Sequence, residues 1–292
     1  MTGESSSARF ECGVILHPAG HTRSPAMHNA AYRALGIDAH YRVWDVPPEN
    51  LAAAIADLRA RGVRQLSVSI PHKETMLEHV DETLPVVRAI GALNTVIREG
   101  DRLIGTNTDW IGALMALERV VPVRGQRAVV LGAGGTARAV VYALRQRECE
   151  VFVLNRTLAR AQSLARELGA AGAFDLDALE RLAPELVVNT TSVGMDRWES
   201  PVASESLSSG MVVLDAVYSP ARTRLLAEAQ ARGAATVGGK WMLVYQAVEQ
   251  LRLWTDRLPH PPGEAALVRV IDVMAEAFDH AGRTPEMPEK PS

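Results

Sequence analysis

Cysteine and long apolar runs are the first things that this sequence lacks. Its 292 residues contain two cysteines, Cys12 and Cys149, and each lies in or beside an apolar run. We expect two buried thiols in a reducing cytosol, which excludes a disulfide scaffold. No apolar run approaches the length of a membrane span, and the first residues lack the basic and apolar regions of a signal peptide. The sequence therefore predicts a cytoplasmic protein without a membrane partner.

An excess of basic charge is also missing. The formal net charge is −3, whereas a protein that binds nucleic acid normally carries a basic stripe. We therefore exclude nucleic acid as a partner. What is present is ordinary globular material, 47% hydrophobic and 22% charged, in a chain long enough for two domains. Both ends are polar or rich in proline, which predicts disordered tails over residues 1–7 and 283–292.

The most informative stretch begins as an apolar run at Val129 and continues into a long apolar-periodic segment after Arg138. Between them, Gly132, Gly134 and Ala137 fit the G-x-G-x-x-[G/A] pattern of a dinucleotide site. The first glycine takes the turn, the second admits the pyrophosphate, and the small third residue lets the helix pack on the strand. The diphosphate then sits on free N–H groups at a helix N-terminus. This glycine loop predicts cofactor contacts at Gly132, Ala133, Gly134, Gly135, Thr136 and Ala137.

The end of the next strand indicates which dinucleotide is bound. A strand over 150–154 begins one helical crossover after the glycine loop. An NAD site would carry Asp or Glu there, whereas this chain has Asn155, Arg156 and Thr157, with Arg160 one helical turn further on. Two guanidiniums in place of a carboxylate suit a 2′-phosphate, which predicts NADP(H). The alternative is that the glycines only make a turn and the arginines are a solvated face.

Strands and helices alternate in the N-terminal part of the chain. We predict strands over 12–16, 41–46 and 65–70, with helices over 25–35 and 48–60 between them. This alternation predicts an α/β unit with a parallel sheet, whose active surface lies at the carboxyl ends of the strands.

Two polar clusters follow those strand ends. Thr22 and Ser24 come after the first strand, while Ser67 and Ser69 share one face of the third, and Lys73 lies in the first turn of the next helix. Four hydroxyls and an ammonium suit a small polyhydroxylated anion. Alternatively, Ser24 is the N-cap of its helix and the two strand serines are only strand ends; for Ser24, cap and ligand are not exclusive.

A hairpin is predicted next, with arms over 90–96 and 104–109 that turn at 99–101. Each arm places amides and hydroxyls beside glycine. Asp109 ends the second arm and can be explained simply as the cap of the following helix. Alternatively it pairs with Lys73 in a cleft, a recognised way to position a proton carrier.

The rest of the chain completes the nucleotide unit and then returns to the first. The predicted strands are 186–189, 212–216 and 235–237, and the predicted helices are 223–232, 241–254 and 264–280, with a loop over 238–240. The fold class is therefore α/β, with an N-terminal substrate domain, a Rossmann-type doubly wound NADP domain, and C-terminal helices that pack back on the first domain. The predicted substrate domain is 8–110 with 243–282, and the predicted NADP domain is 111–242.

Over essentially its whole ordered length, the sequence resembles the shikimate dehydrogenase family. Several separated motifs in family order carry this resemblance. They are residues 21–25, 68–73, 91–95, 105–109, 155–157 and 242–246, for the family's S-x-S-P, V-T-x-P-x-K, G-A-x-N-T, G-x-N-T-D, N-R-T and M-L-x-x-Q, together with the glycine loop. The resemblance implies NADP-dependent, reversible reduction of 3-dehydroshikimate to shikimate in aromatic amino-acid (chorismate) biosynthesis. The expected partner is that small molecule, without a metal, in a monomer or homodimer.

The resemblance also implies roles for individual residues. It assigns the substrate carboxylate to Thr22 and Ser24, the ring hydroxyls to Ser69, Asn94, Asp109 and Gln246, and catalysis to the pair Lys73 and Asp109. It places Tyr218 beside the substrate, and Val217, Gly239 and Met242 beside the nicotinamide cofactor. Whether Lys73 transfers the proton or mainly stabilises the oxyanion is left open, because an ammonium beside a carboxylate is a reluctant acid.

The sequence departs from the family pattern at a few positions. Thr22 stands where the family usually has Ser, and Ser69 where it usually has Thr, so both positions keep a hydroxyl. Ser67 replaces the usual Asn, so that one contact with the substrate ring is lost or made through water. Residues 238–241, Gly-Gly-Lys-Trp, replace the usual D-G-L-x before the final motif. These changes leave open a quinate/shikimate dehydrogenase of broader specificity. A separate alternative, of another class, is a non-catalytic NADP-binding regulator on the same fold. Retention of Lys73 and Asp109 argues against the regulator.

Overall fold

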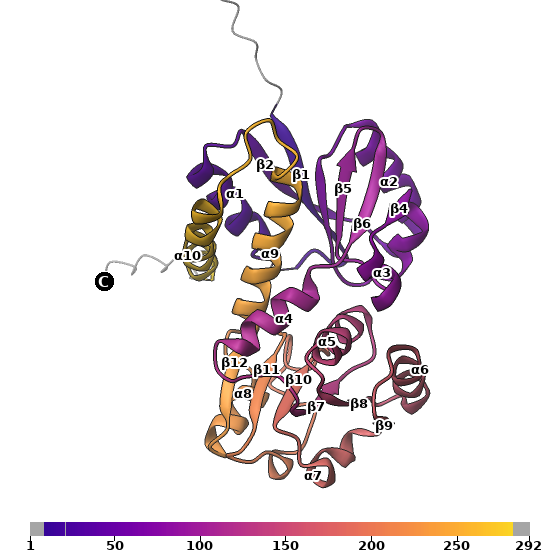
Figure 1. The fold of residues 1–292 in the computed structure, drawn as a ribbon, viewed down its shortest axis with the longest axis vertical. Coiled ribbons are helices and arrows are strands. Elements are labelled where there is room, and N and C mark those ends of the chain that lie inside the picture. Colours follow the sequence, from indigo (N-terminus) through magenta and orange to yellow (C-terminus); the bar gives the residue numbers. More distant parts are fainter. Residues whose placement is uncertain (1–8, 21, 283–292) are drawn as a thin grey trace, which may run out of the picture.

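Two six-stranded sheets, each with its own helices, form the upper and lower halves of the protein in Figure 1. The computed structural model describes residues 9–20 and 22–282. The predicted tails, 1–7 and 283–292, and His21 of the first motif lie outside the described residues. The predicted two-domain α/β architecture is confirmed. Across the described residues, no helix combines the length and apolar character that crossing a bilayer requires.

The upper sheet contains both parallel and antiparallel strands. Its order is β2 (Ala39–Asp45), β1 (Phe10–Leu16), β3 (Gln65–Val68), β5 (Thr95–Glu99), β6 (Arg102–Thr106) and β4 (Glu82–Thr83). The predicted parallel arrangement is right for β2, β1 and β3. It does not extend to β5, which runs antiparallel to β3 and forms the predicted hairpin with β6. The sheet therefore brings the end of β3 next to the start of β5.

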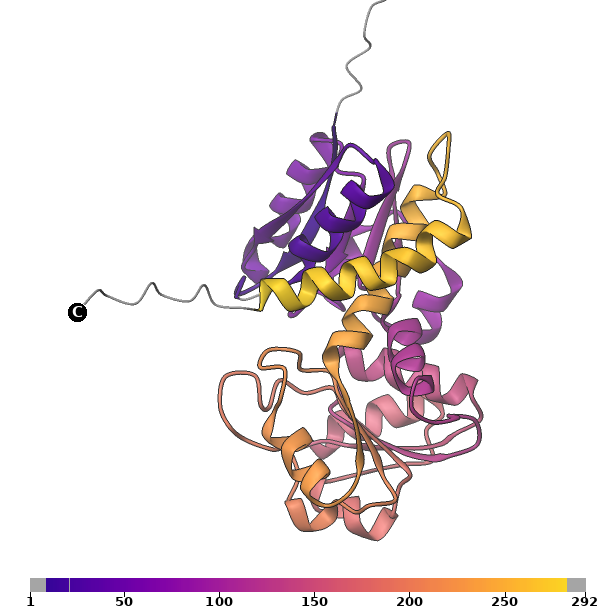
Figure 2. The ribbon, with the colours of Figure 1, turned by 90° about the vertical axis from the view of Figure 1, so that its left-hand side faces the viewer.

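Helices cover both faces of the upper sheet because its strands are apolar on both faces. In β1, Cys12 and Val14 face one core and Ile15 faces the other. The first core is closed by α1 (Ser24–Leu35), α9 (Gly239–Thr255) and α10 (Glu264–Ala281), and the second by α2 (Leu51–Ala60). Figure 2 shows α10 lying beside α1. The C-terminal helices thus return to the first domain, as predicted.

The lower sheet is parallel throughout and doubly wound. Its order is β12 (Ala235–Gly238), β11 (Val212–Asp215), β10 (Leu186–Asn189), β7 (Arg127–Leu131), β8 (Glu150–Leu154) and β9 (Gly172–Phe174). In the central strand β7, Val130 packs in one core and Val129 in the other, and both are fully buried. The chain leaves β7 in one direction and β10 in the other, so the glycine loop lies at the switch point where such sheets bind ligands.

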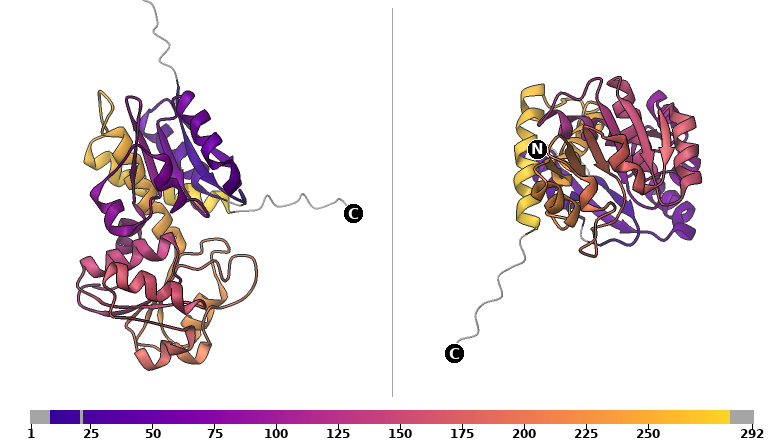
Figure 3. Two further views of the ribbon diagram at one scale, coloured as in Figure 1. Left: turned by 90° about the vertical axis from the view of Figure 1, so that its right-hand side faces the viewer. Right: turned by 90° about the horizontal axis from the view of Figure 1, so that it is seen from below.

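The remaining helices complete the lower half and connect it to the upper one. They are α5 (Gly135–Gln146), α6 (Leu158–Leu168), α7 (Leu179–Leu182) and α8 (Arg224–Ala231), besides α3 (Pro85–Ile90) and α4 (Asp109–Glu118). Short 3₁₀ helices cover Pro48–Asn50, Thr75–His79, Leu176–Ala178 and Ser204–Ser206. Helices α4 and α9 pass between the two halves in Figure 1 and in the left view of Figure 3. They pack against each other and hold the domains together.

Three predicted helix boundaries are wrong. Ser24 is the first residue of α1 and Arg23 is its N-cap, just as Thr108, not Asp109, is the N-cap of α4. Lys73 lies in a turn before a 3₁₀ helix, because its carbonyl accepts a hydrogen bond from the Leu93 N–H instead of continuing a helix.

The predicted loop over 238–240 is also wrong. Gly238 ends β12 and α9 begins at Gly239. A Cβ at Gly239 would lie 2.6 Å from the Ala216 carbonyl oxygen, so the chain is pressed against the end of β11 at this point. Strand therefore passes directly into helix.

Candidate active site

An ammonium–carboxylate pair lies where the two domains meet. Lys73 Nζ is 2.5 Å from Asp109 Oδ2, and the two side chains are 13% and 6% exposed. Lys73 comes from the turn after β3, and Asp109 comes from the first turn of α4, which follows the β5–β6 hairpin. The pairing of neighbouring strands thus joins two residues that the sequence proposed as partners. Burial strengthens their attraction, because less water screens it.

Amides behind Asp109 fix the orientation of its carboxylate. The Asn94 Nδ2 group lies 2.8 Å from Asp109 Oδ1, 2.9 Å from Gln246 Oε1 and 3.0 Å from Thr108 Oγ1. The Asp109 backbone N–H donates to Asn107 Oδ1 at 2.9 Å. Sequence reasoning did not single out Thr108 and Asn107, although both belong to the motif that ends in Asp109. All five residues are buried, so the carboxylate is held in one place.

A second group of polar side chains gathers at the end of β1. The Ser24 backbone N–H lies 3.4 Å from Thr22 Oγ1, and Ser24 is buried. Tyr218, which follows β11 of the other domain, is close to Thr22: burial raises the pKa of its phenol, and the nearby Thr22 side chain acts in the opposite direction. The phenol therefore stays neutral and can donate a hydrogen bond. Ser69 is half-buried one residue beyond β3.

Ser67 is bonded inside the protein. Its hydroxyl lies 2.9 Å from Gln250 Oε1, 2.6 Å from the Tyr41 hydroxyl and 3.0 Å from Gln65 Nε2. A hydroxyl has one proton to donate and two lone pairs, and these three contacts use all of them. Sequence reasoning missed Gln250 and Tyr41, because Gln250 is 183 residues away in the chain. Ser67 is therefore committed to the core of the substrate domain.

The glycine loop has the geometry that a dinucleotide requires. Gly132 has a φ of +114°, and a Cβ there would lie 2.6 Å from Thr190 Oγ1, so only glycine fits. At Gly134 nothing lies within 4 Å of an added Cβ, which leaves space for a phosphate. Ala137 is fully buried where α5 packs on the sheet. Gly134 is the N-cap of α5 and offers no side-chain cap, so the first N–H groups stay available to an anion.

The residues predicted to choose the cofactor follow β8, beside the glycine loop. Arg156, Thr157 and Arg160 are exposed, and Arg160 Nη2 lies 3.5 Å from the Ala133 carbonyl oxygen of the glycine loop. Asn155 Nδ2 donates to the Thr157 carbonyl at 3.0 Å and so shapes this turn. The Arg160 guanidinium thus lies beside the glycine loop, and the exposed Arg156 follows the same strand. These residues fit NADP.

The three residues predicted beside the nicotinamide are near one another. Val217 is buried after β11, and its N–H donates to Asp215 Oδ1 at 3.0 Å. Met242 is buried in the first turns of α9, close behind Gly239. Burial raises the pKa of the Asp215 carboxyl, which also accepts a hydrogen bond from Thr223 at 2.6 Å. Sequence reasoning did not identify Asp215, which holds the loop that carries Val217.

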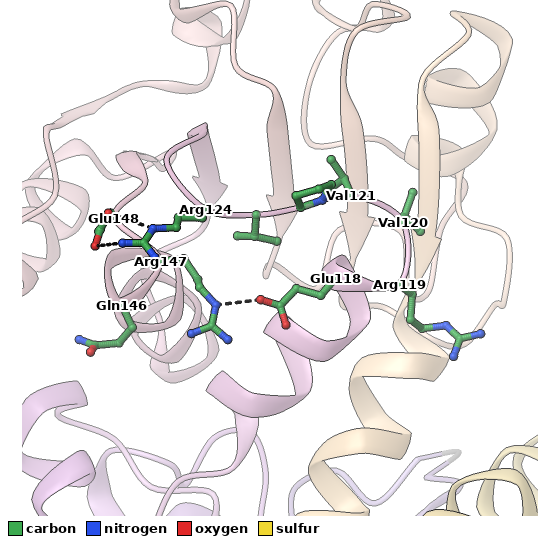
Figure 4. Close-up of a pocket in the computed structure, with 10 residues that line it drawn as sticks. Glu118, Arg119, Val120, Val121, Arg124, Gln146, Arg147 and Glu148 are labelled. Carbon is green, nitrogen blue, oxygen red and sulfur yellow. Dashed lines mark hydrogen bonds and ion pairs between the residues drawn. The ribbon is translucent and has the colours of Figure 1, made fainter.

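A hollow of about 530 Å³ lies away from this site (Figure 4). It is formed by the connection from α4 to β7 and by the turn after α5, and two ion pairs lie in its wall. Arg124 bonds Glu148 at 2.6 Å, and Arg147 bonds Glu118 at 2.8 Å. It contains none of the predicted site residues, so we assign it no role. Within the described residues, no cluster of His, Cys, Asp or Glu is arranged to hold a metal ion.

A Rossmann domain whose glycine loop faces a buried ammonium–carboxylate pair defines the protein as a nicotinamide-dependent oxidoreductase. Two family profiles match the chain: a shikimate dehydrogenase substrate-binding domain over residues 14–96, and shikimate/quinate 5-dehydrogenase over 115–198. The shikimate dehydrogenase (NADP(+)) of Thermococcus kodakarensis is 47% identical over 254 residues, which are 85% of this chain and 91% of that one. The chain belongs to the shikimate dehydrogenase family.

Solved structures agree with this membership. The shikimate 5-dehydrogenase of Thermus thermophilus, in complex with NADP(H) and shikimate, has a TM-score of 0.83 at 39% identity and covers 93% of this chain and 99% of its own. A 5-ketofructose reductase from a Gluconobacter strain has a TM-score of 0.78 at 32% identity, covering 93% and 98%. The same fold thus carries more than one substrate specificity.

Proposed function

We propose that this protein is an NADP-dependent shikimate dehydrogenase, which reduces 3-dehydroshikimate to shikimate reversibly in aromatic amino-acid biosynthesis. The observation that carries the proposal is the Lys73–Asp109 pair, held at 2.5 Å beside the glycine loop. The named relatives support the substrate and the cofactor. The substrate would bind to residues 8–110 with 243–282, and the cofactor to residues 111–242. The protein would be a cytoplasmic monomer or homodimer. Its two cysteines are free and buried.

The chemistry of the reaction explains the arrangement of the pair. A nicotinamide cofactor held at the glycine loop would supply a hydride to the ketone carbon, and negative charge would then develop on the carbonyl oxygen. Lys73 donates a hydrogen bond to this oxygen. Its positive charge stabilises the oxyanion whether or not Lys73 also transfers a proton. Asp109 orients the ammonium and accepts a hydrogen bond from the neighbouring ring hydroxyl. Asn94 and Gln246 complete the set of groups around the ring.

Steady-state rates with shikimate and with quinate, each with NADP⁺ and NAD⁺, test this function directly. We expect the highest kcat/KM for shikimate with NADP⁺. Binding of NADP⁺ without turnover of either substrate would instead identify a non-catalytic regulator.

A dehydrogenase that also accepts quinate is the second candidate, and Ser67 favours it. The hydroxyl of Ser67 is used by Tyr41, Gln65 and Gln250, so it offers the ring no free group of its own. The substrate domain then lacks one hydrogen bond to the ring that would help it to distinguish shikimate from quinate. Quinate turnover within about tenfold of shikimate turnover would support this candidate, since one lost hydrogen bond is worth about 1 kcal/mol.

Thr22→Val and Ser24→Ala should raise the KM for shikimate and leave the KM for NADP⁺ unchanged. We expect this because both residues lie at the end of β1, in the domain that lacks the glycine loop. Each lost hydrogen bond to a carboxylate should raise KM roughly tenfold. Thr22→Ser, which keeps the hydroxyl, is the matched control. If Ser24→Ala lowered the melting temperature but left the KM for shikimate unchanged, Ser24 would be only a structural residue of α1.

A further inference from the structure

The side chain of Lys73 rests on the glycine loop of the other domain. Its Nζ lies 3.0 Å from Thr136 Oγ1, in addition to the 2.5 Å contact with Asp109. Its stem passes over Gly135, where an added Cβ would lie 2.9 Å from Lys73 Cβ and 3.4 Å from Lys73 Cδ. Glycine is therefore required at 135 by a lysine of the substrate domain, whereas the space at Gly134 is open.

The contact with Thr136 controls where the ammonium points. An ammonium has three N–H groups, and the acceptors on Asp109 and Thr136 use two of them, which fixes the direction of the third. Thr136 is the second residue of α5, where the helix dipole favours an anion over a cation. The dipole therefore does not explain why Lys73 lies there, and the hydroxyl of Thr136 does.

Neighbouring contacts keep α5 seated on the substrate domain. Arg138 Nε donates to the Ile90 carbonyl at 2.6 Å, and Ala139 packs against Ile90 and Ala92 in a small buried cluster. The position of Thr136 relative to Lys73 is thus set by an interface between the domains.

We propose that Gly135 and Thr136 of the cofactor domain are positioning residues for Lys73. Gly135 leaves room for the lysine stem, and Thr136 accepts one of its protons, so that the third N–H points at the carbonyl oxygen of the substrate. The ammonium is then aimed only where the two domains are in contact. The inference deepens the proposed function and rests on it for its kinetic test.

Thr136→Val, which replaces the hydroxyl by a methyl group of similar size, should lower kcat for shikimate oxidation roughly tenfold, the loss expected for one hydrogen bond to a charged group. Its KM for NADP⁺ should stay within about twofold, because the backbone N–H groups are unchanged. Thr136→Ser keeps the acceptor and should restore kcat. A change confined to the KM for NADP⁺ would show that Thr136 serves the cofactor alone and would overturn the proposal.

Two adjacent glycines provide a contrasting pair. Gly135→Ala should lower kcat by displacing Lys73, whereas Gly134→Ala meets no protein atom and should raise the KM for NADP⁺ instead. If both variants changed only the KM for NADP⁺, Gly135 would be a phosphate contact and its assignment to Lys73 would be wrong.

Chemical labelling of Lys73 gives a readout that does not need activity. The lysines of the sequence are Lys73, Lys240 and Lys290, so Lys240, which pairs with Asp279, is an internal reference. The protein is treated with a small amine-reactive reagent, and the label on each lysine is measured by mass spectrometry. Thr136→Val should raise the labelling of Lys73 relative to Lys240 several-fold, and Thr136→Ser should not.

Increased labelling in a protein that does not oxidise shikimate would contradict the proposed function but support the positioning. Unchanged labelling and unchanged kcat in an active protein would overturn the positioning.

Discussion

Lys73→Ala is expected to lower kcat by two or more orders of magnitude while the KM for shikimate changes little. The reason is that the ammonium meets charge that develops mainly in the transition state, and groups of this kind contribute about 3 kcal/mol. Its burial beside Asp109, with 13% of the side chain exposed, keeps water from replacing it. The measurement is kcat and KM for shikimate and for NADP⁺ in the wild type and the variant.

Lys240→Ala is the control for this prediction. It removes an identical charge that pairs with Asp279 on α10, 2.7 Å away, and its kcat should stay near that of the wild type. Melting temperatures of both variants show whether either one is poorly folded, since Lys73→Ala leaves the Asp109 carboxylate without its partner cation. A Lys73→Ala protein with nearly normal kcat and only a raised KM would be evidence that Lys73 binds substrate without acting on the transition state.

Much of the fold could be predicted because the central strands have a strong local signature. β8 and β10 have the bounds expected from the sequence, since strands buried on both faces in a parallel sheet are short apolar runs between turns. Gly132 was also predictable, because a tight turn after β7 needs a residue that tolerates positive φ. By contrast, β4 has only two residues and exists through its pairing with β6, so no local pattern predicts it.

The site was predictable where its residues end strands and unpredictable where distant contacts decide their behaviour. The pairing of Lys73 with Asp109 was open to the sequence as an alternative to a helix cap, and the family resemblance implied it; the structure brings the two side chains to 2.5 Å. The Ser67 hydroxyl is bonded inside the core because Gln250 of α9 lies beside it. The contact of Lys73 with Thr136 depends on how the two domains pack. Neither can be read from spacing. The helix caps at Ser24 and Asp109 were wrong because residue preference alone does not fix the last residue outside a helix.

Replacing Arg156 and Arg160 by Ala should lower the affinity for NADP⁺ by about tenfold to a hundredfold and leave the affinity for NAD⁺ nearly unchanged. A guanidinium–phosphate hydrogen bond at a partly exposed site contributes about 1.5 to 3 kcal/mol, and NAD⁺ has no 2′-phosphate to lose. Both arginines are exposed after β8, and Arg160 lies beside the carbonyl of Ala133 in the glycine loop. Because salt screens exposed charges, the preference for NADP⁺ should also shrink as ionic strength rises.

Adding Asn155→Asp to that double variant should move the preference further towards NAD⁺. A carboxylate at the end of β8 accepts hydrogen bonds from the free ribose hydroxyls and repels a phosphate. Asn155 also donates to the Thr157 carbonyl at 3.0 Å, so Asn155→Ala in the same background separates the loss of that bond from the gain of charge. Arg166→Ala is the control for a general loss of positive charge, because Arg166 is exposed on α6 like Arg160 but lies near the opposite end of that helix. The measurement is kcat/KM for both cofactors at low and high salt. A wild type without NADP⁺ preference at low salt, or a triple variant that keeps it, would show that these residues do not select the cofactor.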